Sequence, residues 1–158
     1  MRDVVIVDSV RTGLTKAFRG SFNLTRSDDM LAHCIDSLLD RNPNLSPEEV
    51  EDVVVGAATH AGEQDGNLAR LAVVLSKLPI TVAGVSINRF CSSGLQAIAI
   101  AANQIASGQT EVAIAGGVDS ISMRTRQEPG KAKQNQRLLD EKPDILYGYG
   151  QYCRGSCT

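Results

Sequence analysis

The chain has 158 residues, of which 42% are hydrophobic and only 4% aromatic, and its formal net charge is -2. The length fits one ordinary domain, and the composition supplies a core of Val, Ile, Leu and Ala side chains. A near-neutral charge excludes a strongly basic surface, so we expect neither nucleic acid nor a membrane as a partner.

The sequence also favours a reducing compartment. The first residues, 1–8, lack the long apolar run of a secretory signal, and no apolar stretch is long enough to span a bilayer. Four cysteines are too few for a disulfide-rich secreted domain. We therefore expect either a bacterial cytoplasm or an organelle matrix as the location.

The first third of the chain predicts a strand, a loop and a helix. The β-branched run Val4–Val7 is typical of a buried strand, and Arg11–Asn23 is polar and Gly-containing, as loops are. A helix is expected to open at Ser27, with Asp28 and Asp29 in its first turn, where the helix dipole favours negative charge.

The next segments alternate between strand and helix patterns. Ser46 is a predicted N-cap, with Glu49 closing a capping box. Further strands are expected over Val53–Val55, Thr81–Ile87 and Glu111–Ala115, and helices over Asn67–Lys77 and Ser92–Ser107, the last closed by Gly108. This alternation predicts an α/β fold with a mainly parallel sheet and helices on both faces.

The pattern changes after Ser122. Residues 1–122 are predicted to form the α/β core, and residues 123–151 to begin a polar loop excursion with little periodicity. Residues 152–158 continue no pattern and form a third segment.

Cys91 lies where the third predicted strand meets the following helix. Ligands bind at the carboxyl ends of strands in open α/β sheets, and a helix N-terminus offers free amides and partial positive charge. Such a setting favours a reactive thiolate and lets the Cys91 backbone N–H stabilise an oxyanion. The small Ser92, Ser93 and Gly94 are expected to let a substrate approach. The helix that follows is almost wholly apolar, so we expect it to be buried on most sides.

Position alone leaves a second interpretation open, because a cysteine beside a helix start is commonly a packed core residue. Cys34 shows the contrast: it lies mid-helix on an apolar face and is predicted to be core. Cys153 and Cys157, with no second pair nearby, are interpreted as incidental thiols rather than metal ligands.

The segment Asn88-Arg89-Phe90-Cys91-Ser92-Ser93-Gly94-Leu95-Gln96-Ala97 closely resembles the active-site cysteine motif of thiolases. Three further segments agree with the family in order and spacing. They are Val10-Arg11-Thr12 with Phe18-Arg19-Gly20-Ser21-Phe22, Asp52-Val53-Val54-Val55-Gly56, and Ala115-Gly116-Gly117-Val118-Asp119-Ser120-Ile121-Ser122-Met123, in which the family more often has Glu at the position of Asp119. The resemblance covers the N-terminal part of a thiolase and implies an incomplete half of the thiolase fold.

The resemblance implies that Cys91 carries an acyl group as a thioester while acyl groups move between 3-ketoacyl-CoA and coenzyme A. It implies no metal and no bound cofactor, with coenzyme A and acyl-CoA as substrates, and a homodimer or homotetramer in the full-length protein. Phe90, Ser92, Ser93 and Gln96 are more similar to the degradative branch of the family than to the biosynthetic branch.

The family's other catalytic segments, Gly-His-Pro, Asn-Glu-Ala-Phe and Cys-x-Gly-x-Gly, are not present in the sequence. The only histidines, His33 and His60, lack the Gly-His-Pro context and are interpreted as structural or solvent-exposed. We therefore expect the 158-residue chain alone to be inactive. A non-catalytic fragment that at most dimerises stays an alternative. A ketoacyl synthase-like condensing enzyme is a second, against which the cysteine motif and the Arg11–Thr12 loop argue.

The last segment suggests a reading-frame change. Where the family continues with Thr-Ala-Glu, this chain reads Tyr152-Cys153-Arg154-Gly155-Ser156-Cys157-Thr158. One permitted set of codons for these residues, read one base later, encodes Thr-Ala-Glu-Val-Val-Ala. The hypothesis is that residues 152–158 are an aberrant tail that is not selected for structure.

Overall fold

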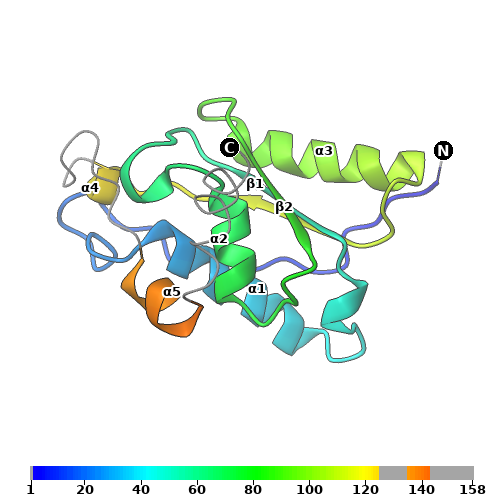
Figure 1. The fold of residues 1–158 in the computed structure, drawn as a ribbon. Coiled ribbons are helices and arrows are strands. Elements are labelled where there is room, and N and C mark those ends of the chain that lie inside the picture. Colours follow the sequence, from blue (N-terminus) through cyan, green and yellow to red (C-terminus); the bar gives the residue numbers. More distant parts are fainter. Residues whose placement is uncertain (1, 125–134, 143–158) are drawn as a thin grey trace, which may run out of the picture.

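A three-stranded parallel sheet forms the centre of the structure (Figure 1), a computed structural model that describes residues 2–124 and 135–142. Its strands are β1 (Asp52–Gly56), β2 (Ala83–Ile87) and β3 (Ala113–Gly117), in the order β2-β1-β3. The register places Val54 of β1 opposite Val85 and Ala115. All three strands therefore end at the same edge of the sheet, where their carboxyl ends meet.

Helices cover both faces of this sheet, as the alternating pattern predicts. The helix α3 (Ser93–Ser107) lies on one face, and α1 (Ser27–Arg41) and α2 (Leu68–Leu75) lie on the other (Figure 1). The remaining helical segments are short: the 3-10 turns η1 (Pro47–Glu49) and η2 (Gly62–Gln64), and the helices α4 (Ile121–Arg124) and α5 (Gln136–Glu141).

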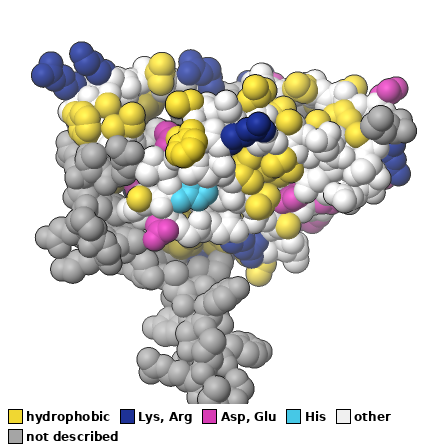
Figure 2. All heavy atoms as spheres, turned by 90° about the horizontal axis from the view of Figure 1, so that it is seen from above, with side chains coloured by type: hydrophobic (Ala, Val, Ile, Leu, Met, Phe, Trp, Pro, Cys, Tyr) yellow, Lys and Arg dark blue, Asp and Glu magenta, His cyan; other side chains and the backbone are white. Residues whose placement is uncertain are grey.

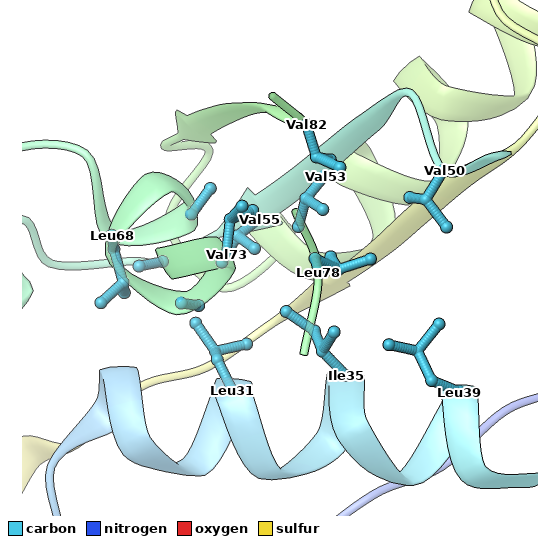
Figure 3. Packing of buried hydrophobic residues seen from close by; sticks show 13 residues of the cluster. Leu31, Ile35, Leu39, Val50, Val53, Val55, Leu68, Val73, Leu78 and Val82 are labelled. Carbon is cyan, nitrogen blue, oxygen red and sulfur yellow. The ribbon is translucent and has the colours of Figure 1, made fainter. Parts of the chain in front are cut away.

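The core is divided by the alternation of side chains along β1. Val53 and Val55 point toward α1 and α2, where they pack in a cluster with Leu31 and Ile35 (Figure 3). Val54 points the other way and packs against Ala97 and Ala101 of α3. All three valines are at most 2% exposed, so the central strand is buried on both faces, as expected for a parallel strand between helix layers.

Several predicted element ends are confirmed by local geometry. The Asn67 side chain accepts a hydrogen bond from the Arg70 N–H at 3.1 Å and so caps α2. Gly108 ends α3 with φ +78°, the left-handed conformation that glycine adopts without strain. The capping signal at Ser46 is also real, since the Glu49 carboxylate accepts from the Ser46 N–H at 2.8 Å, but it starts only one 3-10 turn.

The predicted strand Val4–Val7 is wrong. The segment carries no strand assignment, and Val5, Ile6 and Val7 are 75%, 80% and 82% exposed. It is tethered by its flanks, because the Arg2 N–H donates to Ala106 O at the end of α3 and Asp8 pairs with Arg41 at the end of α1. A β-branched sequence favours the extended backbone, but a strand forms only by pairing with another strand. Among the described residues no strand pairs with this one.

The predictions for β3 and for α3 also need correction. The fourth predicted strand, Glu111–Ala115, lies two residues later, at Ala113–Gly117. The helix α3 is not buried on most sides: Leu95 and Ile98 are 72% and 42% exposed, and its buried residues are Ser93, Ala97 and Ala101. Figure 2 views the molecule from the α3 side and shows hydrophobic side chains distributed over that surface.

The excursion expected over residues 123–151 is only partly described. Within it, α5 packs Leu138 against Ala32, Val74 and Leu75 of the lower helix layer. The tail 152–158, with Cys153 and Cys157, lies outside the described residues. Across the described ranges, every helix is too short or too polar to cross a membrane.

The two-sided burial of β1 gives a first prediction. Val54→Ala removes contacts under α3 and Val53→Ala removes contacts under α1 and α2, so each should lower the free energy of unfolding by roughly 1–3 kcal/mol. Val85→Ala, on the edge strand and 39% exposed, is the matched control and should cost less than either. Urea titrations measure the three values. Equal losses at all three positions would contradict the division of the core along β1.

Candidate functional site

The start of α3 rests directly on the carboxyl ends of β1 and β3. A Cβ atom on Gly56 would overlap the Ser93 carbonyl group and lie 2.6 Å from Gly94 N, and one on Gly117 would lie 2.9 Å from the Gly94 Cα. Side chains at these positions would push the helix away from the sheet. The glycines therefore set where α3 begins, and with it the position of the turn before it.

That turn, Asn88–Ser92, is held by two side chains. Asn88 accepts from the Phe90 N–H at 2.8 Å and donates to the Ala58 carbonyl, beyond the end of β1, at 3.0 Å. Ser93, only 3% exposed, accepts from the Arg89 N–H at 2.8 Å and donates to the Phe90 carbonyl at 2.6 Å. The small residues after Cys91 therefore have structural reasons to be small: Ser93 closes the turn, and Gly94 meets Gly117.

Cys91 projects from this turn as an exposed free thiol, one residue before the N-cap Ser92 of α3. The residue before it, Phe90, has φ +49°, a conformation that non-glycine residues rarely adopt. Its side chain is 76% exposed, so the conformation is imposed by the turn and not by burial of the ring. The structure thus places Cys91 where the sequence predicts it, at a helix start on the carboxyl edge of the sheet.

The sequence also singles out Cys34, His33 and His60, and none of them belongs to the turn that carries Cys91. Cys34 is half-buried on α1 rather than fully in the core, and burial raises the pKa of its thiol, against a smaller lowering by a Thr12 backbone hydrogen bond. His33 is exposed, as expected. His60 follows β1, and its Nε2 atom is buried without a hydrogen-bond partner among the described residues.

A cleft of about 520 Å³ lies between β3, α1 and the N-terminal loop. Cys34 lines it together with residues of Val10–Ala17 and with Ile114 and Gly116, but Cys91 does not. The cleft is thus separate from the turn that carries Cys91, and it lies beside the edge strand β3. No group of three or more metal-binding side chains occurs within the described ranges.

A polar network, buried at Ser27, Glu63 and Gln64, occupies the same edge of the sheet, and sequence reasoning did not find it. Asp119 accepts from the Ala58 N–H at 2.7 Å and from the Gln64 side-chain amide at 3.1 Å. Glu63 and Gln64 contact Ser27, which lies on α1 more than thirty positions earlier in the chain. The helix α1 opens at Ser27, as predicted; its N-cap residue is Arg26, and the Glu63 carboxyl group accepts from the Ser27 N–H.

Comparison with known proteins places this geometry in context. The family described as "Thiolase, N-terminal domain" matches residues 4–147. The beta-ketoadipyl-CoA thiolase of Pseudomonas knackmussii is 44% identical over 150 residues, which cover 95% of this chain and 34% of that protein. The 3-oxoadipyl-CoA/3-oxo-5,6-dehydrosuberyl-CoA thiolase of Escherichia coli is 43% identical over 122 residues, covering 77% and 30%.

A third relative, the 3-ketoacyl-CoA thiolase of Vibrio vulnificus, is 40% identical over 121 residues, which cover 77% of this chain and 31% of that protein. The chain spans about a third of the length of the curated relatives that it matches.

The glycine contact under α3 gives a second prediction. Gly56→Ala should destabilise the protein by about 3 kcal/mol or more, because the added methyl group meets the backbone of Ser93 and cannot rotate away. Gly116→Ala is the matched control, since its Cβ would meet nothing within 4 Å, and it should change stability by less than about 0.5 kcal/mol. Thermal unfolding of both variants measures the difference. A Gly56→Ala protein as stable as the control would show that the helix start is not fixed by this contact.

Proposed function

The chain belongs to the thiolase family, of which it is an N-terminal domain, and from this premise we propose that Cys91 is the acyl-carrying nucleophile of a thiolase. The whole protein would transfer acyl groups between 3-ketoacyl-CoA and coenzyme A. The single observation that carries the proposal is the placement of an exposed thiol immediately before α3, on the carboxyl edge of a parallel sheet. The names of the relatives, which are thiolases of 3-oxoacyl-CoA compounds, support the same substrate class.

The setting of Cys91 suits the chemistry of thioester formation. The Cys91 thiolate attacks the C3 carbonyl carbon of a 3-ketoacyl-CoA and forms a tetrahedral oxyanion. The C2–C3 bond then breaks, the acyl group stays on Cys91 Sγ, and the electron pair leaves with acetyl-CoA, which takes up a proton. The coenzyme A thiol attacks the acyl-cysteine, releases a shortened acyl-CoA, and regenerates the thiol of Cys91.

The turn offers a donor for the oxyanion. Ser92 N–H and Ser93 N–H donate to the carbonyl groups of Arg89 and Phe90 at 3.1 and 3.0 Å, so both are engaged within the turn. Among the described residues no hydrogen bond engages the Cys91 N–H, so it is left for a substrate oxygen. It lies at the N-terminal end of α3, where the helix dipole favours negative charge. A donor fixed by the fold needs no reorientation when charge develops.

The proton transfers of this reaction need groups that resemblance to the family assigns to the Gly-His-Pro, Asn-Glu-Ala-Phe and Cys-x-Gly-x-Gly segments. None occurs in this sequence. His33 and His60 do not replace them, because neither lies in such a segment. The proposed activity is therefore that of the whole thiolase, to which this chain contributes the nucleophile, and the alternative is a fragment without catalysis.

We propose, in addition, that the whole protein is a homodimer or homotetramer with no metal and no bound cofactor. The apolar side chains around the start of α3 support association, since Phe90, Leu95 and Ile98 are all exposed there. Exposed apolar surface commonly marks an interface when it forms a large patch.

The nucleophile is tested by acylation. Incubated with a 3-ketoacyl-CoA, the chain should accumulate an acyl thioester on Cys91 slowly, because the loss of general acid–base catalysis lowers rates by roughly 10²–10⁴-fold. Peptide mass spectrometry locates the adduct, and turnover with coenzyme A should be absent. Cys34→Ser should leave the adduct unchanged, whereas Cys91→Ser should abolish it. Acylation of Cys34 instead, or no adduct at all after long incubation, would contradict the assignment.

Association is tested by sedimentation of the same chain. The exposed apolar residues predict a dimer or larger species, and Leu95→Lys should shift the population toward monomer, because it places a charge in the contact. Asn103→Lys, at an exposed position further along the same helix, is the control. A stable monomer at every accessible concentration would contradict the prediction.

A further inference from the structure

The Glu63 carboxyl group lies buried beneath the first turn of α1. Glu63 is 2% exposed, and Ser27, which it contacts, is fully buried. One carboxyl oxygen, Oε2, accepts from the Ser27 N–H at 2.9 Å, and the other, Oε1, lies 2.7 Å from Ser27 Oγ. The carboxyl group thus serves as the helix cap that the N-cap residue Arg26 does not provide with its own side chain.

Gln64 continues the chain of contacts, and its orientation is fixed by its partners. Its Nε2 atom donates to the Thr59 carbonyl at 2.6 Å and to Asp119 Oδ1 at 3.1 Å. Its Oε1 atom accepts from the Ser120 N–H at 2.6 Å and lies 2.9 Å from Ser27 Oγ. A backbone N–H can face only the oxygen and a carbonyl only the nitrogen, so the amide cannot be turned over.

The number of protons available for hydrogen bonding then decides whether the Glu63 carboxyl group is protonated. The Ser27 hydroxyl carries one proton, yet its oxygen lies at hydrogen-bond distance from both Glu63 Oε1 and Gln64 Oε1. The Gln64 oxygen has no proton to give. If Glu63 were ionised, one of the two contacts would bring oxygens together without a proton between them. A proton on Glu63 removes the conflict, because Glu63 then donates to Ser27 Oγ, and Ser27 donates to Gln64.

We propose that Glu63 is a neutral carboxylic acid in the folded protein, and that it and Gln64 are positioning residues for the turn that carries Cys91. The consequence for Cys91 rests on the proposed function; the protonation of Glu63 does not. Neither residue touches the reacting atoms, so both would act through the loops that follow β1 and β3.

The charges around Glu63 agree with this state. Burial is the largest influence and raises the pKa of the Glu63 carboxyl group, outweighing the Ser27 hydrogen bonds and the Arg26 charge, which lower it; the Asp28 charge adds to the rise. The Arg26 guanidinium is bound to the Asp28 carboxylate by contacts of 3.0 Å, so these two charges offset each other. Asp119, after β3, reaches the site only through Gln64, and the described side chains of α4, 121–123, carry no titratable group.

The route from Gln64 to Cys91 consists of hydrogen bonds and short stretches of backbone. Gln64 holds Asp119, and Asp119 holds the Ala58 N–H at 2.7 Å. The carbonyl of the same Ala58 accepts from Asn88, which in turn accepts from the Phe90 N–H next to Cys91. Loss of the Glu63 proton would leave the single Ser27 hydroxyl proton to serve both Glu63 and Gln64, so one of these two contacts would be lost and the arrangement would loosen from its buried end.

The sign of the pH effect follows from linkage. A carboxyl group whose pKa is higher in the folded than in the unfolded state binds more protons when folded. Its stabilising contribution is complete below the unfolded value and is lost as the pH rises through the raised folded value. The parent chain should therefore lose stability as the pH increases above the ordinary Glu value of 4.5.

Glu63→Gln is the sharpest variant, because the amide keeps a donor for Ser27 Oγ and an acceptor for the Ser27 N–H but cannot ionise. Urea titrations across about pH 5 to 9 should show that the alkaline loss of stability seen in the parent is absent in Glu63→Gln. Glu49→Gln, at an exposed carboxylate that also accepts from a backbone N–H, is the control and should keep the loss. A carbon-13 label on the glutamate carboxyl groups should give one resonance, missing in Glu63→Gln, that titrates above the others. A Glu63 resonance that titrates at the ordinary value would overturn the proposal.

The positioning role has its own readout, the rate at which iodoacetamide alkylates Cys91. The alkylation rates of the parent and of each variant are compared at the same pH, so that ionisation of the Cys91 thiol affects both proteins. Gln64→Leu should change the alkylation rate of Cys91 several-fold. Glu63→Gln should preserve that rate at high pH, where the rate of the parent chain changes. Gln104→Leu is the control, a half-buried glutamine bound to Asp52 far along α3.

Equal rates for Gln64→Leu and Gln104→Leu would overturn the positioning role. A Cys91 that takes up no acyl group in any variant would instead refute the proposed function and leave the titration of Glu63 intact.

Discussion

The contact of the α3 backbone with two strand-end glycines is the constraint on which the site depends. Because Gly56 and Gly117 carry no side chains, the first residues of the helix lie against the strands at backbone distance. Helices normally pack on sheets through a layer of side chains, and here that layer is missing at one end only. The helix start is therefore fixed by hard contacts, and Cys91 inherits its position from them. Further along α3, the contact with β1 is made by Ala97, Ala101 and Val54, which are ordinary core side chains.

Hydrogen bonds fix the same edge of the sheet from the other side. Buried polar groups cost free energy unless each finds a partner, and Gln64 uses both protons of its amide nitrogen and both acceptor sites of its oxygen. A fully satisfied amide permits one arrangement of the loops that it joins, where apolar packing would tolerate several. The glycines thus set the height of the helix above the sheet, and the polar network sets the loops beside it.

The sequence predicted the parts of the fold that are encoded locally. The helices α1, α2 and α3 and the strand β1 follow from periodicity and end signals, and Cys91 lies at the predicted junction. The prediction of a strand at Val4–Val7 failed because strand pairing involves two segments, and the local sequence describes only one of them. The prediction that α3 is buried on most sides failed for a similar reason. An apolar helix sequence indicates which side chains favour burial, but it does not identify the segments that would cover them.

The site beyond Cys91 could not be predicted, because its contacts join distant positions. Glu63 meets Ser27 across 36 positions of sequence, and Gln64 meets Asp119 across 55. Neither Glu nor Gln in a polar loop is unusual, so no local signal marks them. Gly56 could be identified as the end of a strand, but its contact with Ser93 depends on how α3 returns across the sheet.

The backbone at Phe90 shows how these constraints meet at the nucleophile. A left-handed conformation costs a non-glycine residue roughly 1–2 kcal/mol, and a chain free to relax would avoid it. Here the Phe90 N–H is held by Asn88 and its carbonyl by Ser93, so the residue is fixed from both sides. Phe18 shares the conformation and is likewise held through its N–H, by Ser122 in a distant segment. Strain persists in a fold only where surrounding contacts over-determine the backbone. At Phe90 that over-determination turns the chain so sharply that the next side chain, Cys91, lies exposed at the start of a helix instead of packed beneath it.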